Sequence, residues 1–298
     1  RDLQLKTKLS ALEIPDHVFL VPYNPYFLSD TLTVDECHLH RHIDGEVGLD
    51  LVVAAADDPN DMYEAEPLRA TFTMGTDHRR AQVVLQCVEV IKNIFHENDM
   101  PLSTHLIDRK CIFTGDFVTF TESPWGCPLQ QVVDPNGLLA EEATSRTALQ
   151  RQETLRNMQD DNILEQYLSA LNEPENMMEV RQRFLYSMAA WNVIIYVLGL
   201  RNGDTDNVYI DESGIIMHTS FDMFLKGHRA VSGGVSARGK QPFLFPRFFL
   251  RVLGGMGSPL LDRYVSVATG AFMKVRENIG LILANLAMFS NTGIPELM

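Results

Sequence analysis

The sequence has few cysteines and no long apolar run. Its four cysteines, at positions 37, 87, 111 and 127, form no Cys-x-x-Cys pair and are too few for a secreted disulfide scaffold of 298 residues. The longest apolar stretches, Trp191–Leu200 and Ile279–Phe289, have about ten residues each, whereas a membrane-spanning helix needs about twenty. We therefore expect a protein of a reducing compartment, the cytoplasm or the nucleus, without a transmembrane segment.

Basic residues are also scarce, and the shortage is uneven. The net charge is -14, from 25 Lys and Arg against 39 Asp and Glu. Residues 1–122 hold 10 basic and 21 acidic residues, whereas residues 123–298 hold 15 and 18. Eight acidic residues lie between Asp44 and Glu66 with no base among them. This charge argues against nucleic acid or anionic lipid as a partner of the first portion.

The first portion of the chain has the composition of a sheet. Runs rich in Val, Phe and Thr, bounded by turn residues, predict strands at 17–28, 49–56, 69–73 and 111–121. Between the last two, apolar residues at positions 84, 85, 88, 91 and 95 form a helical stripe. Residues 1–122 are therefore predicted to be a sheet that carries one long helix.

The second portion changes to helical periodicity after Pro124. Helices are predicted within 147–171, 175–200, 246–254 and 259–289, and a hairpin at 208–210 and 215–219. Together the two portions predict an α+β protein of two lobes. A β-rich lobe over residues 1–122 and a mainly helical lobe over 123–298 are typical of a kinase-like fold.

Four motifs, in order, carry a resemblance to a known family. Residues 187–225 (SMAAWNVIIYVLGLRNGDTDNVYIDESGIIMHTSFDMFL) resemble the catalytic core of the phosphatidylinositol 3-/4-kinase superfamily. There a helix leads to a Gly-Asp-Arg-His-x-x-Asn loop, a hairpin and an Ile-Asp-Phe-Gly-x-Phe-Leu segment. Residues 74–80, 114–122 and 274–297 resemble the entry to the first-lobe helix, the strand before the hinge, and the closing helix with its Gly-x-Pro-Glu-Leu tail. The order and spacing of the motifs support the resemblance over residues 15–298.

The resemblance implies which positions would carry phosphotransfer, and most of them hold other residue types. The phosphate-binding Lys is matched by Thr73, and the Asp that supports it by Ala81. The catalytic-loop Asp and His are matched by Asn202 and Asp204. The Asp of Asp-Phe-Gly, the principal Mg²⁺ ligand, is matched by Ser220. A neutral hydroxyl does not replace a carboxylate on a hard divalent cation.

Other matched positions keep residues that suit a nucleotide site. Asn207 matches the Asn metal ligand, and Asp222, two residues after Ser220, is placed to enter metal binding in its stead. Asp77 matches the entry to the first-lobe helix. Glu122 matches the hinge, where backbone groups bind adenine, so the remains of a nucleotide cleft are expected at Thr73, Asp77 and Glu122.

Two further segments suggest ligands. Residues 226–251 hold six basic residues and no acid, and the resemblance matches them to the activation loop, which meets the lipid headgroup. They therefore suggest an acidic partner or a phosphoinositide, although a flexible loop that balances an acidic protein is an equal alternative. Cys37–His42 places three histidines at alternate positions, which suits Zn²⁺ if the segment is extended. The alternative is a surface strand or loop without a metal.

The favoured interpretation is a phosphoinositide-3-kinase-like pseudokinase without phosphotransfer. It would serve as a structural or regulatory scaffold in contact with other protein subunits of a complex, and no cofactor is expected for it. The alternative is a divergent active phosphoinositide kinase, which would transfer the γ-phosphate of Mg-ATP to an inositol lipid. A protein kinase of the same superfamily is a third interpretation, less well matched by the tail.

Overall fold

The computed structural model has a mixed helix and strand fold. It describes residues 32–41, 47–55, 68–74, 79–107, 109, 111–115, 118–122, 124–134, 161–200, 205–219, 221, 224–225 and 245–297. The expected mixture of helix and strand is confirmed, and helix predominates among the described residues.

The chain divides into two compact units. Arg1–Gln82 with Arg109–Ser123 form the first, and Val83–Asp108 with Pro124–Met298 form the second. The helix expected in the first lobe runs from Arg79 to Glu97, and its residues from Val83 onward belong to the second unit. The predicted lobes of residues 1–122 and 123–298 stay a prediction.

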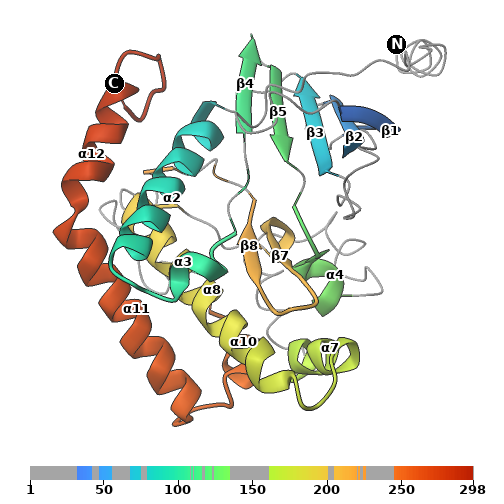
Figure 1. Ribbon diagram of the computed structural model, residues 1–298, viewed down its shortest axis with the longest axis vertical. Helices are drawn as coiled ribbons and strands as arrows, with labels where there is room; N and C mark the ends of the chain where they lie inside the picture. Colours follow the sequence, from blue (N-terminus) through green and yellow to red (C-terminus); the bar gives the residue numbers. More distant parts are fainter. Residues whose placement is uncertain are drawn as a thin grey trace, which may run out of the picture. The chain divides into compact units, whose positions relative to one another are not determined.

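Antiparallel pairing joins five strands in the first unit, in the order β1-β2-β3-β5-β4 (Figure 1). The strands are β1 Leu32–Arg41, β2 Val47–Ala55, β3 Leu68–Met74, β4 Cys111–Gly115 and β5 Val118–Glu122. β3 lies inside the sheet because it pairs with both β2 and β5. Its residue Thr73 consequently has a strand neighbour on each side, Gly48 and Thr119.

The predicted strands at 49–56 and 69–73 are confirmed as β2 and β3. The prediction of one strand at 111–121 is wrong: this run forms two strands, β4 and β5, that pair with each other. β1 includes Cys37–Arg41, for which a surface strand was one of the predicted alternatives. The predicted strand at 17–28 lies outside the described residues.

Helices make up most of the second unit. They are α2 Arg79–Glu97, α3 Leu102–His105, α4 Leu129–Val133, α7 Ile163–Leu171, α8 Met177–Leu198, α10 Arg247–Val252, α11 Pro259–Glu277 and α12 Ile279–Met288. A small sheet contains β6 Cys127–Pro128, β7 Val208–Ile210 and β8 Ile216–His218, and the short 3-10 helix η3 Thr205–Asn207 leads into β7. The predicted hairpin is confirmed as β7 and β8.

α8 forms the centre of the second unit's core. Every residue from Phe184 to Ile195 is buried, so this helix is enclosed by other elements on all sides. α11 runs beside it, and α3, α7 and β8 also contact it (Figure 1). Gly199 ends the helix in a left-handed conformation with a φ of 60° and donates its N–H to carbonyls of the last turn.

Two buried polar side chains of α8, Ser187 and Asn192, are paired with other elements. The Ser187 hydroxyl of α8 accepts the Ile216 N–H of β8 at 3.0 Å, and the Asn192 amide donates to the Tyr264 hydroxyl of α11 at 2.9 Å. A buried polar group left unpaired costs about 1–3 kcal/mol. These bonds therefore fix both β8 and α11 on α8.

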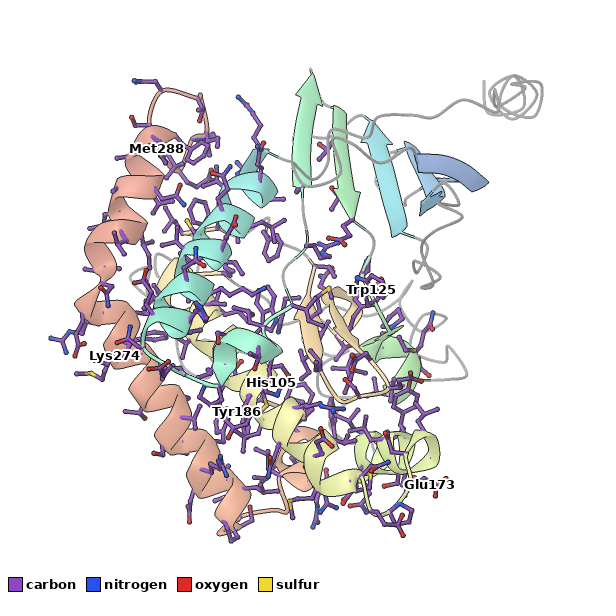
Figure 2. The ribbon with its side chains drawn as sticks, viewed as in Figure 1. His105, Trp125, Glu173, Tyr186, Lys274 and Met288 are labelled. Atoms are coloured by element: carbon purple, nitrogen blue, oxygen red, sulfur yellow. The ribbon has the colours of Figure 1, made fainter. Side chains whose placement is uncertain are left out.

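Tyr186 of α8 contacts both α3 and α11 (Figure 2). Its ring centroid lies 5.1 Å from that of His105 on α3, and the Arg263 guanidinium of α11 lies 5.4 Å from the same ring. Arg263 also donates to the Tyr186 hydroxyl. A cation over an aromatic face is attracted by the ring's quadrupole, so this contact holds α11 against α8.

The predicted helix at 259–289 is two helices, α11 and α12. Asn278 lies between them with a φ of -105° and a ψ of 19°, and both its backbone N–H and its side-chain amide donate to the Lys274 carbonyl. Among the described helices, none combines the length and the hydropathy that a membrane span requires.

Gly126 allows the chain to pass close to β7. Its φ is +84°, and a Cβ atom placed there would lie 2.3 Å from the Ile210 carbonyl oxygen. Both the backbone conformation and the lack of space require glycine. This close approach brings β6 beside β7.

His218 ends β8 inside an aromatic cluster. Its ring centroid lies 5.1 Å from that of Trp191 on α8, and Phe221 stacks on the same indole at 6.3 Å with an interplanar angle of 18°. His218 is only 4% exposed. Burial lowers the pKa of His218 from 6.5 to about 3, because the charged imidazolium would lose its hydration.

This burial predicts a pH dependence of stability. The unfolded chain binds a proton at His218 below pH 6.5, whereas the folded chain does so only near pH 3. The free energy of unfolding should therefore fall as pH falls through this window, by about 1.4 kcal/mol per pH unit. Between about pH 7 and about pH 5, the free energy of unfolding measured with urea should fall by about 2 kcal/mol more in the wild-type protein than in His218→Phe.

The control is His96→Gln, which removes an exposed histidine from α2 and should keep the wild-type slope. If His218→Phe unfolds with the wild-type pH dependence, the buried imidazole is not its source.

Candidate functional site

The strand position matched to the phosphate-binding Lys lies in the middle of the first unit's sheet. Thr73 on β3 pairs with Thr119 on β5, so the two residues lie on the same face of the sheet. Thr119 is fully buried, and among the described residues its hydroxyl has no hydrogen-bond partner. Thr73 and Thr119 are therefore neutral residues at the place where the phosphates of a nucleotide would need a cation.

Thr121 and Cys111 continue the same face at the sheet's edge. They pair between β5 and β4, and the Thr121 hydroxyl donates to the Cys111 sulfur at 3.5 Å. Burial raises the pKa of the Cys111 thiol, an effect that this hydrogen bond and the Arg109 charge partly oppose. The thiol consequently stays protonated at neutral pH and supplies no charge either.

Glu122, the residue matched to the hinge, is the last residue of β5. Its side chain is half-buried, and its backbone carbonyl accepts a hydrogen bond from Nη1 of Arg109 at 3.2 Å. Arg109 is only 8% exposed, which is unusual for an arginine. Sequence reasoning missed this contact, because Arg109 lies outside the motifs that carry the resemblance.

The loop matched to the catalytic loop ends at Asn207. Its carbonyl accepts both the N–H and the hydroxyl of Thr219, at 3.0 and 3.2 Å. These bonds join the start of β7 to the end of β8, next to Ser220. Asn207 is half-buried, and these bonds place it beside Thr219, the residue that precedes Ser220 in the sequence.

The segment that contains Ser220 is anchored on both sides. His218 and Phe221 are buried against Trp191, and Phe224 is fully buried. The Leu225 N–H donates to the Leu198 carbonyl at the end of α8 at 3.1 Å. The described residues on both sides of Ser220 therefore contact Trp191 and the end of α8.

Several predicted site residues lie outside the described residues: Asp77, Asn202, Asp204, Ser220 and Asp222. Lys226, Arg229, Arg238 and Lys240 of the basic stretch do so as well. Of that stretch, the structure describes Arg247 and Arg251, both exposed and four residues apart on α10. Residues at this spacing share one helix face.

Of the matched positions that the structure describes, Thr73, Ala81 and Asn207 carry no charged side chain that could hold Mg-ATP. Mg²⁺ takes carboxylate oxygens and substrate phosphates, and phosphates are bound by cationic side chains. Thr73 has no charge, Asn207 is a neutral amide, and Ala81 on α2 has no polar group. In the part of the chain that the structure describes, no three His, Cys, Asp or Glu side chains gather around a possible metal position.

Comparisons with known proteins agree on one family. The family model for phosphatidylinositol 3- and 4-kinase matches residues 67–298. Phosphatidylinositol 3-kinase 2 of Dictyostelium discoideum is 27% identical over 292 residues, which are 97% of this chain and 14% of that protein. Phosphatidylinositol 3-kinase C2 domain-containing subunit gamma of Rattus norvegicus is 28% identical over 232 residues, 76% of this chain and 14% of that protein.

A human protein is similar to this chain to about the same extent. Phosphatidylinositol 4-phosphate 3-kinase C2 domain-containing subunit beta of Homo sapiens is 26% identical over 235 residues, 78% of this chain and 13% of that protein. The chain thus spans about a seventh of the length of these relatives. Because the family model matches well over half of the chain, the resemblance read from the motifs is confirmed: the chain belongs to the phosphatidylinositol 3- and 4-kinase family.

Proposed function

We propose that this chain is a phosphoinositide-3-kinase-like pseudokinase domain. In this proposal it has two lobes, does not transfer phosphate, and acts as a structural or regulatory module in a larger, cytoplasmic protein assembly. The observation that carries the proposal is the loss of charge at two linked positions, Thr73 and Ser220. The first removes the cation that would hold the phosphates, and the second removes the main carboxylate ligand of Mg²⁺.

The changes at positions 73 and 220 both remove charges on which phosphoryl transfer depends. Phosphoryl transfer depends on positioning and on charges that stabilise the transferred group, and contributions of this kind are among the largest in catalysis. Thr73 replaces a positive charge and Ser220 a negative one, so both the phosphates and the metal lose their partners. Asp204, in place of a histidine, adds a like charge beside an incoming triphosphate.

The retained fold supports a role through shape and surface. The contacts that hold β7, β8 and α8 together use aromatic packing and neutral hydrogen bonds, so they persist without the catalytic charges. α12 also exposes apolar side chains, with Leu281, Leu283 and Met288 exposed by 52, 58 and 72%. Leu281 and Met288, seven residues apart, share one face of the helix, and exposed apolar patches are typical of protein contacts.

The second candidate is a divergent active phosphoinositide kinase. The relatives' names favour it, because each is a phosphatidylinositol or phosphatidylinositol 4-phosphate 3-kinase. Asn207 is retained, Asp222 lies two residues after Ser220, and Asp204 and Asp206 lie in the loop matched to the catalytic loop. If one of these carboxylates binds Mg²⁺ in place of the residue at 220, the family's reaction would persist.

Kinase assays separate the two candidates. The purified protein, given Mg-ATP and phosphatidylinositol vesicles, should form no phosphorylated lipid and no ADP above background. Turnover that disappears in Asp222→Ala or Asp204→Ala, but not in the control Glu212→Ala, would establish a relocated metal ligand and refute the pseudokinase. Glu212 suits the control because it is exposed on the nearby β7–β8 turn.

The basic stretch at 226–251 is proposed to contact an acidic partner surface. The double reversal Arg247→Glu/Arg251→Glu should weaken binding to immobilised poly-glutamate, and so should raising the salt concentration from about 0.05 to about 0.3 M. Arg276→Glu, at an exposed position on α11, is the control. Binding of wild-type protein to phosphoinositide vesicles but not to poly-glutamate would favour the lipid kinase instead.

A further inference from the structure

The segment between α10 and α11 carries the most exposed large apolar side chain of the described residues. Met256 is 83% exposed, and it lies in the segment Leu253–Ser258 that joins the two helices. A side chain so exposed contributes little to the packing of the second unit, so the fold does not require methionine at this position. Single exposed apolar residues are common, however, and the backbone around Met256 and the charges near it carry the argument.

Hydrogen bonds fix the start of this segment on the end of α10. The Gly254 N–H donates to the Arg251 carbonyl and the Gly255 N–H to the Leu250 carbonyl, both at 2.8 Å. With Gly254 in the left-handed region at a φ of +87°, these two bonds form the Schellman motif that ends many helices. The chain therefore folds back onto the last turn of α10 just before Met256.

The end of the segment is fixed on α11. The Ser258 hydroxyl accepts the Leu261 N–H at 3.1 Å and so caps the helix. The Ser258 N–H donates to the Gly255 carbonyl at 3.3 Å, which closes the backbone around Met256. Both ends of the segment are thus tied to helices, and Met256 lies between the ties.

Glycine on each side of Met256 allows this path. Gly255 and Gly257 have φ values of +86° and +77°, and a Cβ atom added to either would meet nothing within 4 Å. The left-handed backbone, and not a lack of space, therefore requires glycine at these two positions. The segment holds Met256 in open surroundings on a backbone of defined conformation.

The surroundings of Met256 are basic, although the chain as a whole has a net charge of -14. Arg251 lies in the helical turn to which the segment is bonded, and Arg247 lies one turn earlier on the same face of α10; both are exposed. The residues from 245 to 263 include three arginines and one acid, Asp262. This local charge is complementary to an acidic surface.

An exposed apolar side chain with charged neighbours has the composition of a protein contact. Such contacts depend on a few apolar anchors that become buried, and a polar rim surrounds the anchors. Methionine suits this role because its unbranched, polarisable side chain adapts to the surface that covers it. A backbone that is already fixed lowers the entropy lost on binding.

We infer that Met256 is the apolar anchor of a contact site for an acidic protein surface, with Arg247 and Arg251 at its rim. The partner would present an apolar pocket among Asp and Glu side chains, as an acidic amphipathic helix does. This inference deepens the proposed function and rests on it, because the acidic partner is the one proposed for residues 226–251. It adds an apolar contact to a site that was so far defined by charge alone.

Two synthetic helical peptides of equal negative charge separate the anchor from general charge attraction. One combines Glu with a face of Leu, and in the other Ala replaces every Leu. Fluorescence anisotropy at about 0.05 M salt should show that wild-type protein binds the Glu/Leu peptide at least about tenfold more tightly, because burial of a methionine side chain contributes that much. Met256→Ser should bind the two peptides with equal affinity.

Met288→Ser is the matched control, because it makes the same change at a methionine that is 72% exposed on α12. This variant and Met256→Leu should keep the preference for the Glu/Leu peptide. Arg247→Glu/Arg251→Glu should weaken the binding of both peptides. If folded Met256→Ser keeps the preference, or if Met288→Ser loses it, Met256 is not the anchor and the inference is overturned.

The outcomes also separate this inference from the proposed function. Binding of both peptides that Met256→Ser leaves unchanged would overturn the anchor and leave the acidic partner standing, whereas binding of neither peptide would refute both. If Met256→Ser weakens binding to phosphoinositide vesicles and leaves peptide binding unchanged, Met256 contacts lipid and the inference is wrong. Phosphotransfer by a protein that keeps the Met256-dependent preference would refute the pseudokinase and support the contact site.

Discussion

The burial of α8 is the constraint on which the second unit depends. Phe184 to Ile195 are buried without interruption, so neighbouring elements must cover the helix on every side. Ser187 holds β8 through the Ile216 N–H, and Asn192 holds α11 through Tyr264. Each of these contacts joins neutral groups. The frame that positions the loops is therefore independent of the charges that a kinase reaction needs.

This independence explains how the family's fold persists with altered motifs. Ser220 lies between His218 and Phe221, both buried against Trp191, and Thr219 bonds to the Asn207 carbonyl. None of these contacts uses the side chain at position 220. In the first unit, Thr73 likewise keeps its backbone pairing with Thr119, because strand register does not depend on the side chain's charge. Fold and function can therefore separate in this chain.

Sequence reasoning succeeded where a pattern is local and repeated. The apolar stripe from position 84 to position 95 predicted α2, and the run at 69–73 predicted β3 within one residue at each end. Sequence reasoning did not predict the break between α11 and α12 at Asn278. At the site, motif order predicted the matched positions. The contact of Arg109 with Glu122 depends on strand register, which has no local signature in a single sequence.

Isothermal titration calorimetry with Mg-ATP tests most directly whether the chain has lost the charges that hold a metal-bound triphosphate. Titrations with and without Mg²⁺ should give no saturable heat, because residues 1–122 are strongly acidic and Thr73 supplies no cation to offset them. Micromolar affinity that requires Mg²⁺ would contradict this, since it would show that other residues hold both the phosphates and the metal.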